Sequence, residues 1–147
     1  MIVGVTDHYT YGYKNVEELL KLSGTEETIL LERTPCFIWS PGLEAMEMDK
    51  VLNTSDLLPT MLNLLGIDSP YDYIGHDAFA ESYAGFVPFS NGSWISGDIA
   101  YDAGEGEVLL LEEDAKVEET FLVEMAEEVS EFVYINNLIL ETDYYEE

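Results

Sequence analysis

An aspartate and a histidine stand next to each other at Asp7 and His8, and this pair is the part of the sequence best suited to chemistry. A carboxylate oxygen and an imidazole nitrogen are suitable ligands for Mn²⁺ or Zn²⁺, and less suitable for Mg²⁺. Where a strand ends the chain turns, so that two adjacent side chains can reach one ion from different sides. A catalytic metal needs at least three protein ligands and an open position. Taken alone, the pair fits a structural role better, with the aspartate capping the loop and the histidine bonded to a backbone carbonyl.

Aromatic residues near this pair are candidates for the mouth of a substrate site. Tyr9 and Tyr11 follow it directly, and packing within the loop explains them equally well. Trp39 has a ring suited to stacking on a glycerol or a sugar, although aromatic residues beside strands are usually buried or half-buried. The single cysteine, Cys36, has no partner for an internal disulfide, and its apolar neighbours predict a buried thiol.

The elements that would position the pair begin with a short apolar strand over residues 1–6. Its β-branched, non-alternating pattern predicts a parallel strand buried on both faces. Asn15 is expected to cap a short helix that ends at Ser23 and Gly24. Residues 34–40 form a second predicted buried strand, which Pro41 and Gly42 end.

Residues 54–66 carry the clearest helix pattern, with Gly66 as the stop. Pro59 fixes the start of this helix, because a proline is tolerated where the backbone amide has no intrahelical partner. With Asp56 as the N-cap, Pro59 falls at the third helical position. Capping is therefore the expected role of the Asp56 carboxylate.

The rest of the chain predicts an antiparallel meander followed by a helix. Residues 86–111 are strand-rich and contain the tight-turn signal Asn91-Gly92. Residues 114–132 form an amphipathic helix whose glutamates are expected to be its solvated face, because they lack the spacing and glycine of a calcium loop. Residues 133–147 are expected to add a short strand or helix with an acidic end. The apolar stripe of the helix is Val117, Phe121, Met125, Val129 and Phe132.

The chain is strongly acidic, with 5 Lys and Arg residues, 31 Asp and Glu residues and a formal net charge of −26. Most of that charge lies after residue 50, where a single basic residue, Lys116, accompanies 22 acidic ones. Such a chain cannot neutralise a row of phosphates, which excludes an unaided nucleic-acid binder, and it is repelled by anionic membrane surfaces. A hydrophobic content of 47% nevertheless argues against disorder. A predicted helix after each early strand indicates an α/β domain, with a parallel beginning and an antiparallel end. No apolar run is long enough to span a bilayer, so direct membrane insertion of this segment is not expected.

Six motifs in a fixed order give the chain a family resemblance. Together they resemble the C-terminal part of the sulfatase-like domain of lipoteichoic acid synthases and related phosphoglycerol transferases, within the alkaline phosphatase superfamily. The matching pieces are VTDHY at 5–9 with Tyr11 and Gly12 behind it, TPCFIWSPG at 34–42, SDLLPTMLNLLG at 55–66, GHDAF at 75–79, FSNGSWI at 89–95 and LETDYY at 140–145.

The resemblance implies a fold and a reaction. The fold would be the C-terminal portion of an alkaline-phosphatase-like mixed sheet flanked by helices. In it, residues 1–85 belong to the core, and residues 86–147 add a small antiparallel sheet and the amphipathic helix to the same domain. Asp7 and His8 would be two ligands of a divalent cation, usually Mn²⁺, with Mg²⁺ or Zn²⁺ as alternatives. A threonine, activated by the metal, would attack a phosphatidylglycerol-type substrate, forming a glycerophosphoryl-enzyme and releasing diacylglycerol before the group passes to an acceptor.

The sequence departs from the family because the threonine nucleophile, a first glutamate ligand and the basic residues that hold phosphate are not among these 147 residues. The expectation is a soluble fragment, inactive alone, whose partner is the missing N-terminal part of the same domain. The parent protein would be anchored at the extracellular face of the plasma membrane. His76 is a further candidate ligand or substrate contact, although a structural loop role is favoured. The alternatives are a stand-alone acidic interaction or cation-binding module without catalysis, and a relative among the sulfatases or phosphonate transferases.

Overall fold

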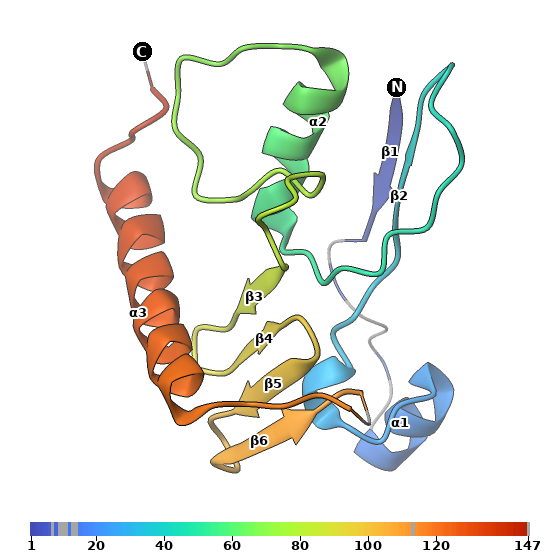
Figure 1. Cartoon of the computed structure of the whole chain (residues 1–147), viewed down its shortest axis with the longest axis vertical. Helices are drawn as coiled ribbons and strands as arrows, with labels where there is room; N and C mark the ends of the chain where they lie inside the picture. The colour runs from blue at the N-terminus through green and yellow to red at the C-terminus, as the bar shows by residue number, and fades with distance from the viewer. Residues whose placement is uncertain (7, 9–11, 13–14, 113, 147) are drawn as a thin grey trace. The chain divides into compact units, whose positions relative to one another are not determined.

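The computed structural model describes residues 1–147 except positions 7, 9–11, 13–14, 113 and 147. It consists of two compact units, Met1–Met48 and Asp49–Glu147, and each is described by itself. In Figure 1 the first unit contains β1, α1 and β2, and the second contains α2, the strands β3 to β6 and α3. The second unit thus includes all of residues 86–147 and the part of residues 1–85 that begins at Asp49.

Two short strands form the sheet of the first unit. β1 (Ile2–Val5) and β2 (Cys36–Trp39) pair antiparallel, with Ile2 opposite Trp39 and Val5 opposite Cys36. The prediction of a parallel strand at the start of the chain is therefore wrong. The predicted burial is also wrong, because every residue of both strands is either exposed or half-buried. A short apolar run is compatible with several kinds of strand, and its partner is set by tertiary structure that periodicity does not report.

The side chains of β2 are more exposed than their apolar character suggested. Cys36 is exposed, which corrects the prediction of a buried thiol, and partial burial still raises the pKa of its thiol. Phe37 is 61% exposed, and its ring lies over Gly4, where a Cβ atom would overlap it. The glycine in β1 therefore makes room for the aromatic ring on the neighbouring strand.

The helix α1 (Val16–Ser23) forms as predicted. The Asn15 side chain accepts a hydrogen bond from the backbone amide of Glu17 at 3.0 Å, which is the expected N-cap. Gly24 ends the helix in the left-handed conformation, with φ of 71°. A short 3₁₀ helix, η1 (Thr28–Leu30), follows in the same unit.

In the second unit, the predicted helix begins as a 3₁₀ turn. η2 (Thr54–Asp56) leads directly into α2 (Leu57–Leu65), with Pro59 as the third residue of α2 and Gly66 as the left-handed stop, both as predicted. Asp56 stands at the N-cap of α2, as predicted, but in the described part of the chain its carboxylate makes no capping hydrogen bond to this helix. Instead Asn53 caps η2, accepting from the amide of Ser55, and Asp56 accepts from the amide of Asn53 in return.

The predicted meander over residues 86–111 is confirmed. Four strands pair antiparallel in chain order, and Gly92 and Gly97 supply positive φ angles of 93° and 53° in the first two turns. Short turns of this kind join antiparallel neighbours without a crossover. The strands are β3 (Phe86–Pro88), β4 (Trp94–Ser96), β5 (Ile99–Asp102) and β6 (Glu107–Leu110).

A single long helix, α3 (Glu119–Glu141), follows the sheet and runs beside it in Figure 1. It begins later than the predicted 114 and continues past the predicted end at 132, because no glycine or proline interrupts residues 119–141. Its apolar stripe packs as predicted, with Val129 in the core cluster together with Trp94 and Ile99. The predicted solvated face is also confirmed, since the glutamates opposite the stripe are exposed.

The described residues form two antiparallel sheets and three α-helices, and this mixed α/β content confirms the predicted fold class. In the described part of the chain, no helix combines the length and the apolar character that crossing a membrane requires.

Candidate functional site

The predicted metal ligands follow the end of β1. Asp7, Tyr9 and Tyr11 lie outside the described residues, and His8 is exposed. Among the residues that the structure describes, no group of three or more His, Cys, Asp or Glu side chains is arranged to hold a metal ion. The ligand roles of Asp7 and His8, and the substrate-mouth roles of Tyr9 and Tyr11, therefore stay predictions.

Trp39 is placed by the register of the two-stranded sheet. It lies opposite Ile2, whereas β1 ends at Val5, opposite Cys36. At about 3.3 Å per residue, Trp39 is about 10 Å along the strand from the end of β1 that precedes His8. Its ring is 56% exposed and so is open to a ligand, but the sheet does not bring it beside the end of β1. Its role at a substrate mouth stays a prediction.

The second unit contains a polar centre that the sequence did not reveal as such. Asp56 is 1% exposed, and its carboxylate accepts three hydrogen bonds. The amide of His76 donates to Oδ1 at 2.8 Å, while the amide of Asn53 and the hydroxyl of Tyr83 donate to Oδ2 at 2.9 and 2.8 Å. A buried carboxylate with this many donors is stabilised as a structural node, and here it joins η2 to two later segments of the chain.

His76 belongs to the loop after α2, as expected from the sequence, and its ring stacks on that of Tyr83 with centroids 4.6 Å apart. The preceding residue explains how the loop comes so close to η2. A Cβ atom at Gly75 would overlap the backbone carbonyl of Ser55, so only glycine fits there. The Gly-His-Asp motif thus brings a backbone amide to Asp56, and the histidine contributes this amide rather than its imidazole.

Further hydrogen bonds join the two motifs at 55–66 and 75–79. The Thr60 hydroxyl donates to the backbone carbonyl of Asp56 at 2.6 Å and accepts from the amide of Ala78 at 2.9 Å. The Asn63 amide group donates to the Asp77 carboxylate at 2.7 Å. Two motifs that are separate in the sequence therefore pack against each other. Most of their polar side chains make the hydrogen bonds that join them.

Tyr83 gives this centre a dependence on pH. Burial, followed by its hydrogen bond to Asp56, raises the pKa of the Tyr83 hydroxyl well above its ordinary value. Burial and the neighbouring tyrosines also raise the pKa of Tyr145. A group whose pKa is raised on folding stabilises the folded state fully below its unfolded pKa, which for tyrosine is about 10, and loses that contribution as pH rises through the folded pKa.

We expect the free energy of unfolding to fall as pH rises above about 10, measured by urea unfolding at a series of pH values. The variant Tyr83→Phe should show a shallower fall than the wild type. Tyr134→Phe is the matched control, because the Tyr134 side chain is 66% exposed, and it should retain the wild-type slope. An equal slope in all three proteins would contradict the role assigned to Tyr83.

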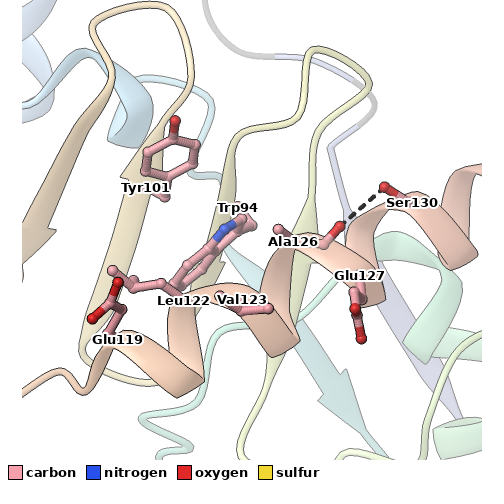
Figure 2. A pocket seen from close by; sticks show the side chains of 8 residues that line it. All are labelled: Trp94, Tyr101, Glu119, Leu122, Val123, Ala126, Glu127 and Ser130. Atoms are coloured by element: carbon pink, nitrogen blue, oxygen red, sulfur yellow. Dashed lines mark hydrogen bonds between the residues drawn. The ribbon is translucent and has the colours of Figure 1, made fainter.

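A cavity of the second unit, with a volume of about 680 Å³, lies beside the core. In Figure 2 the indole of Trp94 points towards the side chains of α3, and the ring of Tyr101, which also lines the cavity, points away from the helix. Ser130 of α3 also lines this cavity, and its hydroxyl donates a hydrogen bond to the backbone carbonyl of Ala126 at 3.0 Å. The cavity therefore presents mainly apolar surface that continues the packing around Trp94.

Comparison with known proteins finds no family model that matches the chain. It does find curated relatives. Lipoteichoic acid synthase 2 of Bacillus subtilis is 32% identical over 103 residues, which is 65% of this chain and 16% of that protein. The lipoteichoic acid synthases of Staphylococcus saprophyticus and of Staphylococcus aureus strain USA300 are 32% and 34% identical over 109 and 110 residues, in each case 71% of this chain and 17% of the relative. The chain thus spans about a sixth of the length of these relatives, and the resemblance drawn from its motifs is confirmed.

Proposed function

Because the chain is homologous to part of the lipoteichoic acid synthases, we propose that it forms part of a phosphoglycerol transferase. Such an enzyme would move a glycerophosphate group from a phosphatidylglycerol-type lipid to an acceptor. The observation that carries the proposal is the similarity to these synthases over 65–71% of the chain. The strongly acidic surface is consistent with a part that does not itself hold the anionic lipid, since that task needs basic groups or a metal.

The contribution of this chain to the reaction would be the Asp7 carboxylate and the His8 imidazole, as two ligands of a divalent cation. The donor set fits Mn²⁺ best, with Zn²⁺ or Mg²⁺ as alternatives. When bound, such an ion supplies Lewis-acid stabilisation of charge at a phosphoryl group. In this proposal the remaining ligands and the threonine nucleophile belong to polypeptide outside these 147 residues.

The first unit has the surface expected of a piece that other polypeptide covers. None of its described residues is buried, and β1 and β2 present Ile2, Val5, Phe37 and Trp39 with 46–61% of their surface exposed. An apolar sheet with unpaired edges is a template for further strands. We propose that the rest of the same domain covers it, within a protein anchored at the extracellular face of the membrane by other segments.

The test uses the full protein that carries this chain, assayed for release of diacylglycerol from phosphatidylglycerol vesicles with added Mn²⁺. Asp7→Ala and His8→Ala are expected to abolish turnover, because each removes a metal ligand, while the thermal unfolding midpoint stays near that of the wild type. Mutating a residue that only hydrogen-bonds to a metal ligand already costs about 10–100-fold in metal affinity or activity, and removing the ligand itself should cost more. Glu44→Ala, which removes an exposed carboxylate of the same unit, is the control and should retain activity.

Turnover near the wild-type level in both ligand variants, with the metal content unchanged, would exclude the ligand role. The 147-residue chain alone is expected to bind Mn²⁺ only weakly, because a site with two ligands leaves the ion largely hydrated. Micromolar affinity by calorimetry, lost when both residues are replaced, would contradict an incomplete site. It would favour instead a stand-alone cation-binding module without catalysis.

A further inference from the structure

A second cavity, of about 540 Å³, lies within the Asp49–Glu147 unit and does not involve the predicted metal ligands. Its walls come from α3 between Glu128 and Ile139, from Thr142 and Tyr144 after it, from the segment between Asp72 and Phe86, and from Asp56. Its volume is in the range of sites that enclose small organic molecules. The question is which chemistry its walls would select.

One wall of the cavity is apolar. Phe86 and Phe132 pack edge to face with centroids 6.4 Å apart, and Ile135 and Ile139 continue this surface along α3. Such a surface favours a ligand with an apolar body, because burying apolar area contributes about 25 cal/mol per Å². It would contribute nothing to binding a hydrated inorganic ion.

The remaining wall is acidic. Asp72, Glu128 and Glu131 line the cavity with exposed carboxylates, and none of the described lining residues is a lysine or an arginine. Glu128 and Glu131 are three residues apart on α3 and so lie on the same face of the helix. The carbonyl end of the helix dipole also lies on this side, near Thr142, and favours positive charge. An anionic ligand is therefore excluded from this cavity.

The carboxylates do not form a metal site. Among the described residues no three His, Cys, Asp or Glu side chains are arranged to hold an ion, and the carboxylate of Asp56 already accepts three hydrogen bonds from the protein. The rings of Tyr73 and Tyr144 also line the cavity, and aromatic faces attract organic cations. We propose that this cavity is a binding site for a small organic cation with an apolar body, such as an alkyl or aralkyl ammonium compound.

In this site the ammonium group would lie near Glu128 and Glu131, and the apolar body would lie against Phe132, Ile135 and Ile139. The proposal is separate from the metal site, because every lining residue belongs to the second unit. It can therefore be tested on the 147-residue chain, whatever the outcome for Asp7 and His8.

The experiment compares three probes that share one apolar body: 4-phenylbutylamine, 4-phenylbutanol and 4-phenylbutyrate. Their affinities for the full 147-residue chain are measured by calorimetry at pH 7 in 0.15 M salt, which screens the attraction of any cation to the net charge. We expect the amine to bind at least about fivefold more tightly than the alcohol, and the carboxylate not to bind measurably. Equal affinities for the amine and the alcohol would overturn the proposal.

Two matched substitutions on α3 separate the cavity from general attraction. Glu131→Gln should weaken binding of the amine by about two- to fivefold and leave binding of the alcohol unchanged. Glu124→Gln removes the same charge from an exposed position of the same helix that does not line the cavity, and should leave both affinities unchanged. Equal effects of the two substitutions would overturn the proposal. So would a lysine-containing peptide that binds much more tightly than the amine and displaces it, since the site would then serve a protein partner.

Discussion

Replacing Asp56 by alanine is expected to lower the free energy of unfolding by about 3–5 kcal/mol, because three donors lose their partner and each costs about 1–3 kcal/mol if it stays buried. The donors are the amides of Asn53 and His76 and the hydroxyl of Tyr83. They come from segments on both sides of α2, so the loss affects the start of the helix and the loop that packs on it. The free energy of unfolding of a domain of this size is about 5–15 kcal/mol, so this substitution would remove a large part of it. The measurement is urea unfolding followed by circular dichroism.

Two further variants separate this role from a simple loss of charge. Asp68→Ala removes an exposed carboxylate from the loop after α2 and should change stability by no more than about 0.5 kcal/mol. Asp56→Asn keeps the size of the side chain but can no longer accept at both positions, so it should fall between the wild type and the alanine variant. If Asp56→Ala were no more destabilising than Asp68→Ala, the carboxylate would not be the structural node that its hydrogen bonds indicate.

Elements whose signals are local were predicted well. The caps of α1, the stop at Gly66 and the antiparallel meander depend on residues within a few positions of one another. The same is true of the stripe on α3, where Val129 and its neighbours at three- and four-residue steps pack on Trp94. Capping, turn chemistry and amphipathic spacing act over short distances, so the sequence alone carries them.

The errors concern partners that lie far away in the chain. Asp56 was assigned to capping because Pro59 correctly marks the start of the helix, but its hydrogen bonds reach His76 and Tyr83, 20 and 27 residues further on. The strand β1 looked buried because its residues are apolar, yet its partner in the structure is β2 in an antiparallel ladder. Neither contact produces a periodic pattern of hydrophobic residues in the sequence. The Gly75-His76-Asp77 motif did, however, mark the loop whose backbone amide binds Asp56.

For the candidate metal site, too, the sequence alone identifies only residues that are close together in the chain. Asp7 and His8 are adjacent, so their common role is suggested by the sequence, whereas a complete ligand set must be assembled from distant segments. The acidic cavity beside α3 was not foreseen, because its glutamates lie within a solvated face and only the fold brings Phe86 and Tyr73 opposite them. The glutamates of α3 line a cavity only because the segment that carries Tyr73 and Phe86 forms its opposite wall.

Replacing Trp94 by alanine is expected to destabilise the second unit by about 3–5 kcal/mol, the usual cost of removing a fully buried tryptophan. Trp94 is 1% exposed in β4, and its ring lies 5.8 Å from that of Phe121 on α3 and 6.3 Å from that of Tyr101 on β5. It therefore joins the helix to the sheet, and its loss should also weaken the docking of α3. Trp39→Ala is the matched control, because the Trp39 side chain is 56% exposed, and it should cost less than about 1 kcal/mol.

The two tryptophans of the chain also give this comparison a spectroscopic readout. In Trp39→Ala the remaining emission comes from buried Trp94 and should shift to the red on unfolding in urea. In Trp94→Ala the remaining emission comes from exposed Trp39 and should shift little, so unfolding is then followed by circular dichroism. Equal losses of stability in the two variants would contradict the placement of Trp94 at the centre of the core. A large loss in Trp94→Ala alone would show that the packing of α3 on the sheet, and with it the wall of the acidic cavity, depends on this side chain.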